Sequence, residues 1–244
     1  MYDYDETIFE GLSSRLSVVR SNLADACREA GRDPKEITLI GVSKVFPVSY
    51  AEAAFVAGLS DLGENRVQEL VPKAERMSEL GLDVNWHLIG TLQKNKVKYI
   101  IGKTKLIHSV DSTELAGEIS KRSVSAGLVS DILLQVNVSG EVTKHGYTPL
   151  SVIEEIDKVN ALDGEKVRGI MTMAPIDSGD GISRRVFSET HELFEKMKSE
   201  VRSKEDFDTL SMGMSGDYRN AILEGSTCVR IGTAIFGNRN ALNT

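Results

Sequence analysis

The feature of this sequence that most restricts its fold is a repeated alternation of short apolar runs with longer amphipathic stretches. The apolar runs are short and rich in β-branched residues, which is typical of buried strands. They are Ile37–Val42, Ser60–Leu62, Asn85–Ile89, Lys105–Val110, Asp131–Val138, Val167–Met171, Leu210–Met212 and Cys228–Ile231. Eight strands alternating with helices at about 30 residues per unit predict an α/β fold, a closed (β/α)8 barrel of the TIM type.

The stretches between the strands have helical spacing. Before the first strand, Ile8, Leu12, Leu16, Val19 and Leu23 recur every three or four residues, which predicts an N-terminal amphipathic helix. Further helices are expected at Val48–Gly58, from near Glu64, at Leu92–Ile101 and at Val186–Val201. Residue types typical of helix starts are Ser49 with Glu52, Asp111 with Glu114, and Thr148 followed by Pro149.

The chain length of 244 residues suits either one barrel or two ordinary domains. The strand count favours one domain spanning residues 1–244, because (β/α)8 barrels commonly have about 250 residues. The alternative is an open doubly wound sheet. Its G-x-G-x-x-G fingerprint is missing after the first strand, where Gly41 stands alone.

The composition excludes several classes of function. There are 29 Lys and Arg against 36 Asp and Glu, so the net charge of −7 disfavours nucleic acid as a partner. No run reaches the ~18 apolar residues that cross a membrane. The N-terminus carries Asp3, Asp5 and Glu6 where a signal peptide would be basic, so we expect a cytoplasmic protein.

Neither the cysteines nor the histidines are spaced as metal ligands. Cys27 and Cys228 lie far apart in the sequence and form no Cys-x-x-Cys pair, so no disulfide framework is expected. The histidines also lack ligand spacing, and no metal site is predicted; they are His87, His108, His145 and His191.

In a barrel of this kind, the residues that follow the strands surround the active site. Lys44 closes the first strand, where partial burial can lower the pKa of an amine and make it a Schiff-base nucleophile. The alternative is a lysine whose stem packs on the rim while its ammonium group reaches water. Position alone leaves both open.

Two later loops have the composition of phosphate-binding loops. Ser211–Asp217 follows the seventh strand, and Gly232–Ala234 follows the eighth. Glycines, hydroxyls and helix N-termini bind phosphate, and barrels commonly place a phosphate after these two strands. The alternative is ordinary helix capping by Ser215, Asp217 or Thr233.

Two further segments have less specific patterns. Gly63-Glu64-Asn65 suits a site loop or a turn before a helix equally well. The lysines that follow the third strand predict a solvated helix face, with weak anion binding as the minority alternative; they are Lys94, Lys96, Lys98, Lys103 and Lys105.

Taken together, these segments resemble the pyridoxal phosphate homeostasis proteins, whose barrel is similar to the N-terminal domain of bacterial alanine racemases. The segments that carry the resemblance are Gly41–Lys44, Gly63–Asn65, Val67–Glu69, Trp86–Lys96, Gln135–Glu141, Lys144–Gly146, Arg168–Pro175, Ser211–Asp217 and Val229–Gly237. The resemblance covers nearly the whole chain. It implies a fold type III-like barrel that binds pyridoxal 5′-phosphate (PLP).

The resemblance also implies a role for individual residues. Lys44 would form the internal aldimine with PLP, and Asn65 would line the cofactor pocket. Ser215, Gly232 and Thr233 would hold the phosphate. Arg230 would lie near the pyridine nitrogen, where a permanent cation disfavours protonation and makes the ring a weaker electron sink. The sequence departs from the commoner family pattern at Arg66, where an aromatic residue often follows Gly-Glu-Asn.

Three functions follow from a lysine at this position. The resemblance implies a non-catalytic protein that buffers, stores or delivers PLP, with PLP-dependent apoenzymes as partners. The alternative is a PLP-dependent amino-acid racemase or related enzyme. A class I aldolase without cofactor ranks last, because the resemblance connects Lys44 with PLP.

A racemase needs a second acid/base group on the opposite face of the substrate. In the racemases that this barrel resembles, a tyrosine from an additional C-terminal domain of the partner subunit supplies it. This chain ends at Thr244, shortly after Gly237, so we expect binding rather than catalysis, and a monomer. Tyr147 and Tyr218 are the tyrosines near the predicted rim, where packing or exposure is the favoured role.

Overall fold

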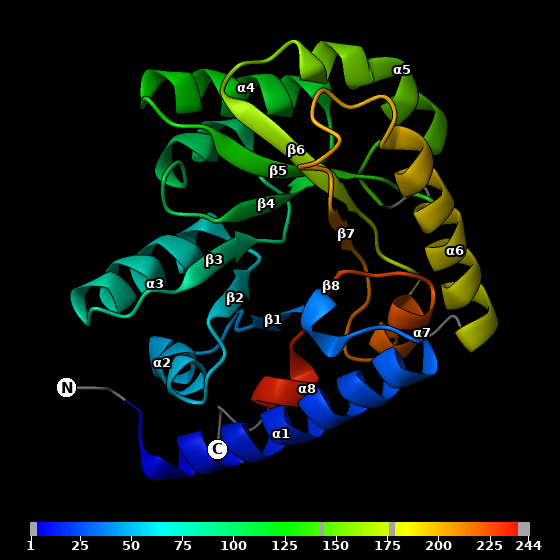
Figure 1. Ribbon diagram of the computed structural model, residues 1–244. Helices are drawn as coiled ribbons and strands as arrows, with labels where there is room; N and C mark the ends of the chain where they lie inside the picture. The colour runs from blue at the N-terminus through cyan, green and yellow to red at the C-terminus, as the bar shows by residue number, and fades with distance from the viewer. Residues whose placement is uncertain (1–3, 142–143, 176–178, 239–244) are drawn as a thin grey trace.

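The computed structural model is a closed barrel of eight parallel strands surrounded by helices (Figure 1). It describes residues 4–141, 144–175 and 179–238. The strands are β1 Thr38–Val42, β2 Asp61–Glu64, β3 Asn85–Leu88, β4 Leu106–Val110, β5 Ser130–Gln135, β6 Glu165–Met171, β7 Thr209–Ser211 and β8 Cys228–Ile231. Each strand pairs with the next, and β8 pairs with β1. The predicted (β/α)8 barrel is therefore confirmed.

The helices form an outer ring (Figure 1). They are α1 Glu6–Glu29, α2 Val48–Val56, α3 Val67–Glu79, α4 Thr113–Ser125, α5 Pro149–Asn160, α6 Gly179–Met197, α7 Tyr218–Leu223 and α8 Thr233–Phe236, with 3-10 helices η1 Pro34–Glu36 and η2 Lys94–Tyr99. No helix among the described residues is both long enough and apolar enough to cross a membrane.

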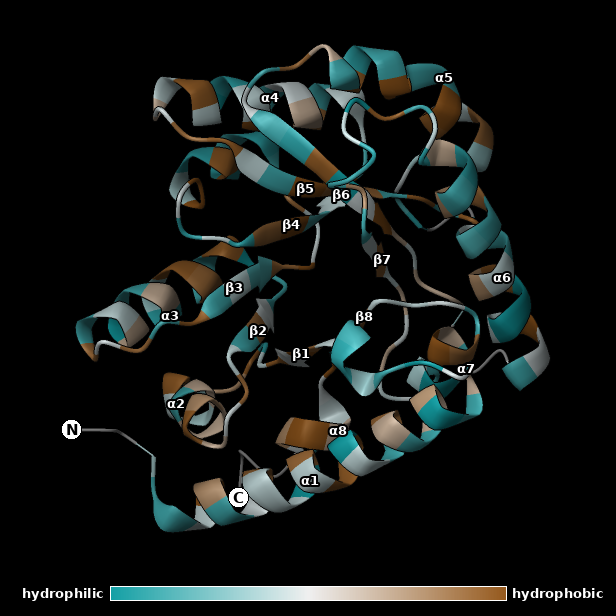
Figure 2. Ribbon diagram, viewed as in Figure 1, coloured by the Kyte–Doolittle hydropathy of each residue, from teal (hydrophilic) through white to brown (hydrophobic). Residues whose placement is uncertain are grey.

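The helix α1 lies across the side where the barrel closes, against α2, α7 and α8 (Figure 1). Hydrophobic and hydrophilic residues alternate along it (Figure 2), and the predicted residues Leu12, Leu16, Val19 and Leu23 are buried. The Nε atom of Arg15 donates to the carbonyl oxygen of Ile235 at 2.7 Å. The predicted N-terminal helix thus fixes α8, which follows the last strand.

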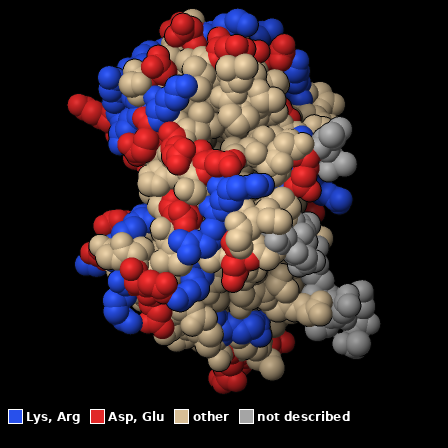
Figure 3. Space-filling model, turned by 90° about the vertical axis from the view of Figure 1, so that its right-hand side faces the viewer, with Lys and Arg blue, Asp and Glu red and all other residues tan. Residues whose placement is uncertain are grey.

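The surface mixes charges of both signs. On the face drawn in Figure 3, Lys and Arg side chains lie among Asp and Glu. Arg184 of α6 pairs with Glu224 at 2.6 Å, and Arg168 pairs with Asp208 at 2.7 Å. Such interspersed pairs leave no broad basic area on that face for a phosphate backbone to bind.

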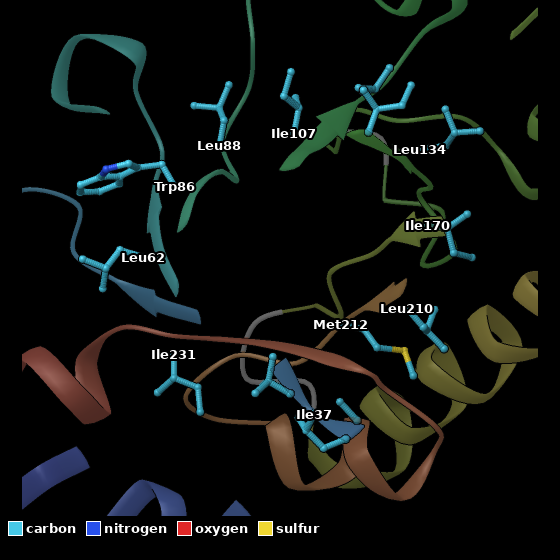
Figure 4. Close-up of a cluster of buried hydrophobic side chains, with 14 of the residues drawn as sticks. Ile37, Leu62, Trp86, Leu88, Ile107, Leu134, Ile170, Leu210, Met212 and Ile231 are labelled. Carbon is cyan, nitrogen blue, oxygen red and sulfur yellow. The ribbon is translucent and has the colours of Figure 1, made fainter. Parts of the chain in front are cut away.

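The main core lies between the strands and the helices. The apolar side chains that alternate along each strand point away from the barrel axis into this layer (Figure 4). Leu62, Leu88, Ile107, Ile170 and Ile231 come from five different strands, and each is fully buried. Burying one such side chain stabilises the fold by about 1.5–3 kcal/mol, so this layer is the main source of stability.

The other side of each strand faces the barrel interior. There, Leu106, Leu133 and Met171 form a small apolar cluster with Met173. The rest of the interior contains buried polar side chains, including His87, His108, Ser211 and Arg230. Bulky branched residues fill most barrels of this fold, so a polar interior needs a specific explanation.

The predicted start of α2 at Val48 is confirmed, but the predicted capping residues of α2 and α4 are wrong. The first residue of α2 is Val48, after Pro47 and without a side-chain cap. The predicted capping box therefore fails: Ser49 already lies inside the helix, and Glu52 is buried and 3.7 Å from Arg76 of α3. At α4 the cap is Ser112 rather than Asp111. The side chain of Glu52 is thus used in a tertiary contact at α2, whereas α4 is capped locally, one residue later than predicted, because Ser112 accepts from the N–H of Leu115.

Other boundaries also differ from the sequence prediction. The segment expected as a helix at Leu92–Ile101 is the shorter 3-10 helix η2, and its lysines are exposed or half-buried as predicted. The strand β5 ends at Gln135 rather than at Val138. The helix α6 begins at Gly179, before the predicted Val186, because its polar first turns lack the apolar spacing that predicts a helix.

Candidate functional site

Lys44 lies in a turn directly after β1, half-buried, at the carboxyl end of the barrel. The neighbouring Val45 has a φ of 66°, a left-handed conformation that costs a β-branched residue roughly 1–2 kcal/mol. The backbone N–H of Val45 donates to Oε2 of Glu69 at 2.7 Å. The carboxylate of Glu69, on α3, thus holds the lysine turn in a conformation that it would not adopt by itself.

A buried ion pair supports the same turn from below. Nζ of Lys73, on α3, donates to Oε1 of Glu64 at 2.5 Å and to the carbonyl oxygen of Ser43 at 2.9 Å. The hydroxyl of Ser43 also donates to Oε1 of Glu64, at 2.6 Å. Burial raises the pKa of Glu64, while Lys73 and Ser43 act to lower it.

Sequence reasoning missed this ion pair. Gly63-Glu64-Asn65 suits a loop or a turn in the sequence, but Glu64 is the last residue of β2. Lys73 has only 7% of its surface exposed. A lysine on the apolar face of an otherwise amphipathic helix was the signal that could have found it.

The two predicted phosphate loops lie next to each other. Ser215 lies in the turn after β7, and Gly232 precedes the first residue of α8, Thr233. The backbone N–H of Ala234 donates to Oγ of Ser215 at 3.5 Å, and that of Arg230 donates to the carbonyl oxygen of Gly213 at 3.0 Å. The loops after the seventh and eighth strands therefore form one continuous surface.

The capping alternative is supported for Ser215 alone among the three candidates, because its hydroxyl accepts from the first-turn N–H of Ala234 in α8. Gly232 is the residue at the N-cap of α8, and it has no side chain, so Thr233 is the first helical residue. Asp217 precedes α7, but its side chain forms no cap hydrogen bond with that helix. Instead Oδ1 of Asp217 accepts from the N–H of Met214 at 2.6 Å, within the loop itself. Asp217 thus shapes its loop rather than capping α7, whereas Ser215 connects its loop to the first turn of α8.

Arg230 points along the barrel interior and is 4% exposed. Its Nη1 donates to Oγ of Ser211 at 2.5 Å, and its Nη2 donates to the carbonyl oxygen of Thr172 at 2.9 Å. Burial lowers the pKa of the guanidinium, and Asp217 acts against that shift. Two hydrogen bonds from neighbouring strands thus hold a buried cation below the phosphate loops.

Closure of the barrel brings the lysine turn and the phosphate loops together. Gly41 of β1 pairs with Ile231 of β8. A Cβ atom added to Gly232 would lie 3.4 Å from the carbonyl oxygen of Val42, two residues before Lys44. Lys44, Ser215, Gly232 and Thr233 are far apart in the sequence, yet they occupy one quadrant at the carboxyl end of the barrel.

Asn65 lies beside that quadrant, after β2, and is half-buried. It lines a cavity of about 500 Å³ together with residues of the segment after β3, among them Thr91 and Lys96. Gly90 packs against it so closely that an added Cβ atom would lie 2.4 Å from the carbonyl oxygen of Asn65. The backbone of Asn65 is therefore fixed by the next strand of the barrel.

The two candidate tyrosines differ in their surroundings. Tyr147 is buried, and its hydroxyl lies 3.1 Å from Oγ1 of Thr113, the first residue of α4. Burial raises the pKa of Tyr147 to about 12. Tyr218 is half-buried at the start of α7. The surroundings of Tyr147 favour packing, as the sequence analysis expects.

The sequence as a whole matches known proteins. The family model for the alanine racemase N-terminal domain matches residues 15–240. A pyridoxal phosphate homeostasis protein from Aquifex aeolicus is 43% identical over 225 residues, covering 92% of this chain and 97% of that protein. This chain belongs to the pyridoxal phosphate homeostasis protein family. A family member from Escherichia coli K12 is 35% identical over 230 residues, covering 94% of this chain and 97% of its own length.

Solved structures agree with the family assignment. PipY of Synechococcus elongatus PCC7942, solved with PLP bound, has a TM-score of 0.82 at 31% identity and covers 93% of this chain and all of its own. A protein from Bifidobacterium adolescentis reaches 0.89 at 34% identity, covering 96% of this chain and 98% of its own. An alanine racemase from Clostridium difficile 630 has a TM-score of 0.73 at 16% identity, covering 94% of this chain and 57% of the racemase, which shows a common barrel fold alone.

Proposed function

We propose that this protein binds pyridoxal 5′-phosphate at the carboxyl end of its barrel and takes part in PLP homeostasis as a buffer, store or donor of the cofactor. The observation that carries the proposal is the convergence of Lys44 with the loops after β7 and β8 in one quadrant. Family relatives are named for this role, and PipY contains PLP in its structure.

The donor groups of the quadrant fit the chemical groups of PLP. Lys44 would hold the aldehyde through its amine. The hydroxyls of Ser215 and Thr233, with the backbone amides of Gly232 and Thr233 at the start of α8, would hold the phosphate, because glycines, hydroxyls and amides at a helix start bind anions. Arg230 would lie near the pyridine nitrogen, and Asn65 would form part of the pocket wall. An added Cβ atom at Gly216 would meet no atom within 4 Å, so the phosphate loop has open space beside it.

We infer that the protein is a carrier rather than an enzyme. PLP supplies an aldehyde that reacts with amines and a ring that withdraws electrons when its nitrogen is protonated. The buried guanidinium of Arg230 disfavours that protonation. The hydroxyl of Tyr147 keeps its proton at neutral pH and lies beside Thr113, so it is a poor base for a racemase. A racemase therefore remains the second candidate, supported by the common barrel fold alone.

The binding proposal is tested with purified protein and added PLP. Wild-type protein is expected to become yellow, and borohydride reduction followed by peptide mapping should find the cofactor on Lys44. The Lys44→Ala variant should lose the visible absorption band, whereas Lys98→Ala, which removes an exposed lysine of η2, should keep it. A colourless wild-type protein would overturn the proposal. If peptide mapping found the cofactor on the buried Lys73, the attachment site would be Lys73 rather than Lys44.

The carrier proposal is tested by transfer and by turnover. PLP-loaded protein should restore activity to a PLP-dependent apoenzyme, and the Lys44→Ala variant treated in the same way should not. Incubation with L-alanine and other amino acids should leave their chirality unchanged within the error of chiral chromatography. Sustained racemisation over many turnovers would favour the racemase alternative.

We also propose that the protein acts as a monomer in the cytoplasm. Exposed large apolar side chains lie on separate elements, for example Val18 on α1, Val56 on α2, Leu150 on α5 and Ile182 on α6. Stable dimers commonly need contiguous apolar area at their interface. Light scattering after size-exclusion chromatography should give a mass near 26.7 kDa. A mass twice as large would contradict the monomer.

A further inference from the structure

A line of hydrogen bonds crosses the polar interior of the barrel. Starting from Arg230, the donor atom Nη1 reaches Oγ of Ser211. That oxygen lies 3.0 Å from Nδ1 of His108. Nε2 of His108 lies 3.0 Å from Nδ1 of His87, and Nε2 of His87 lies 3.0 Å from Oδ1 of Asp61. These five residues, which we call the interior relay, come from β8, β7, β4, β3 and β2.

The relay runs between the two ends of the barrel. Asp61 is the first residue of β2, whereas the lysine turn follows the last residue of β1, and the two strands are parallel. Nζ of Lys105 lies 3.1 Å from Oδ1 of Asp61, and half of the Lys105 side chain is exposed. His87 and Lys105 also line a cavity of about 480 Å³ at the amino ends of the strands. One end of the relay therefore lies near solvent and the other under the proposed cofactor site.

Because the relay is buried, it destabilises the fold unless each donor in it faces an acceptor. His87 is 2% exposed, and His108 and Ser211 are fully buried. An unpaired polar group in such surroundings costs roughly 1–3 kcal/mol, which an apolar barrel interior would avoid. The relay is therefore a feature whose hydrogen-bond directions matter.

The directions can be derived from Asp61. Although burial raises the pKa of this carboxyl, His87 and Lys105 bring it down to about 2, so Asp61 is a carboxylate at neutral pH. A carboxylate only accepts, so Nε2 of His87 carries the proton and donates. Burial lowers the pKa of His87, although Asp61 acts to raise it, and burial lowers the pKa of His108 well below the usual value. Both rings are therefore neutral at neutral pH.

A neutral imidazole with a proton on Nε2 has a bare Nδ1. Nδ1 of His87 must therefore accept from Nε2 of His108. Nδ1 of His108 is then bare and accepts from the hydroxyl of Ser211. That hydroxyl has its proton turned toward His108, so its lone pairs face Arg230. Reversing the series would require a protonated Asp61 or a charged, buried histidine.

The other titratable groups near the relay do not oppose this assignment. Cys228 pairs with Ser211 across β7 and β8, and burial raises the pKa of its thiol to about 11, against a side-chain hydrogen bond with Ser211 that acts to lower it. The thiol is therefore neutral and, as a weak donor, can share the Ser211 oxygen without taking its proton. Asp217 acts on Arg230 from the loop after β7, and its carboxylate favours the guanidinium charge. Lys105 adds a positive charge next to Asp61, which favours the carboxylate.

We propose that Asp61, at the opposite end of the barrel from Lys44, fixes the tautomers of His87 and His108 and thereby turns the Ser211 hydroxyl to accept from Arg230. Asp61, His87, His108 and Ser211 are positioning residues, because they act on the cofactor only through the guanidinium of Arg230. The effect on PLP rests on the proposed function. The assignment of the tautomers does not rest on the proposed function, because it follows from hydrogen bonds within the protein itself.

The first test measures the tautomers directly in protein without cofactor. Nitrogen-15 NMR of labelled histidines should show His87 and His108 neutral, with the proton on Nε2, from pH 6 to 8. His145 and His191 lie outside the relay and are assigned with His→Gln variants. Asp61→Asn should change the tautomer population of His87, whereas Asp208→Asn, at the same end of the barrel but paired with Arg168, should not. A proton on Nδ1 in wild type, or unchanged tautomers in Asp61→Asn, would overturn the inference.

The second test follows the relay to the cofactor. Ser211→Ala should raise the dissociation constant for PLP by roughly threefold to tenfold, the fold-change that corresponds to a net hydrogen-bond contribution of about 1 kcal/mol. Asp61→Asn should act in the same direction, and Asp208→Asn should have no effect. The double variant Asp61→Asn/Ser211→Ala should be no weaker than Ser211→Ala alone, because both changes act through Ser211. Additive effects in the double variant would contradict the relay.

Circular dichroism establishes that each variant is folded before PLP is added. If wild-type protein binds no PLP, the proposed function fails, and the NMR result still decides whether the relay exists. If PLP binds but the tautomers differ from those derived above, the relay fails and the proposed function stands.

Discussion

At the scale of single residues, the lysine turn depends on neighbours that carry no chemistry themselves. Val45 holds an unfavourable backbone conformation beside Lys44, and the carboxylate of Glu69 accepts its N–H. Glu64 and Lys73 form a buried pair under Ser43. Strained residues persist only where their surroundings determine them, and they cluster at functional sites. The side chains of Glu64, Glu69 and Lys73 thus hold the residues on either side of Lys44.

Glu165 should make the free energy of unfolding fall as the pH rises. Glu165 is 1% exposed, its Oε2 has no hydrogen-bond partner, and burial raises its pKa to about 7 despite the opposing charge of Arg202. Because the folded pKa lies above the unfolded value of 4.5, the free energy of unfolding should decrease as pH rises from 4.5 to 7, by up to about 3 kcal/mol.

Replacing Glu165 tests whether the free energy of unfolding falls, rather than rises, with increasing pH. Glu165→Gln should stabilise the protein at pH 8 relative to wild type and have a smaller effect at pH 5, as measured by urea unfolding at both values. Glu154→Gln, on the exposed face of α5, is the matched control and should change neither. Equal effects of Glu165→Gln at pH 5 and pH 8 would contradict the raised pKa.

At the scale of elements, helix starts differ in how far local sequence determines them. Thr148 accepts from the N–H of Ser151 at 3.0 Å, and the hydroxyl of Ser151 accepts from the N–H of Thr148 at 2.9 Å. The predicted start of α5 is therefore confirmed by a local capping box. The start of α2 has no such cap, because its Glu52 is buried against α3. A helix cap can be predicted from the sequence only when the capping residue and the residue that it bonds lie within one helical turn of each other.

This difference predicts a contrast between two substitutions. Thr148→Ala should lower the free energy of unfolding by about 1 kcal/mol, the usual cost of losing an N-cap. Ser49→Ala should change it little, because Ser49 lies inside α2 and no side chain caps that helix. Urea unfolding of both variants measures the contrast. If Ser49→Ala lowered the free energy of unfolding by a similar amount, Ser49 would cap α2, contrary to the structure.

At the scale of the whole molecule, closure of the sheet assembles the candidate site. The pairing of β8 with β1 brings Gly232 to the end of the first strand. The helix α1 lies over that closure and contacts α2, α7 and α8. Elements from both ends of the described chain therefore support each other, and we propose that residues 1–244 fold as a single domain. Residues 239–244 at the end of that range lie outside the described part.

The single-domain proposal predicts one cooperative unfolding transition. The one tryptophan of the sequence, Trp86, is buried in the layer between β3 and the helices (Figure 4). Its fluorescence should therefore report tertiary unfolding while far-UV circular dichroism reports the helices. The two urea curves should coincide, as expected for a two-state domain. Separated midpoints would indicate two folding units.

The sequence predicts the eight strands of the barrel, which the structure confirms, and it predicts that Lys44 and the loops after the last two strands lie at the carboxyl end. It could do so because apolar periodicity reports burial along a chain, and glycines and hydroxyls mark loops locally. Lys44, Ser215 and Gly232 are candidates that such patterns single out, and their roles stay predictions.

The side chains that surround these residues are known only from the tertiary structure. The histidines of the relay were visible in the sequence, but the residues that bond to His108 lie 21 and 103 positions away. The pair of Glu64 with Lys73 likewise depends on how α3 packs beside β2. Sequence patterns report whether a side chain is buried and not which partner it meets, because that partner is set by strand register and barrel closure.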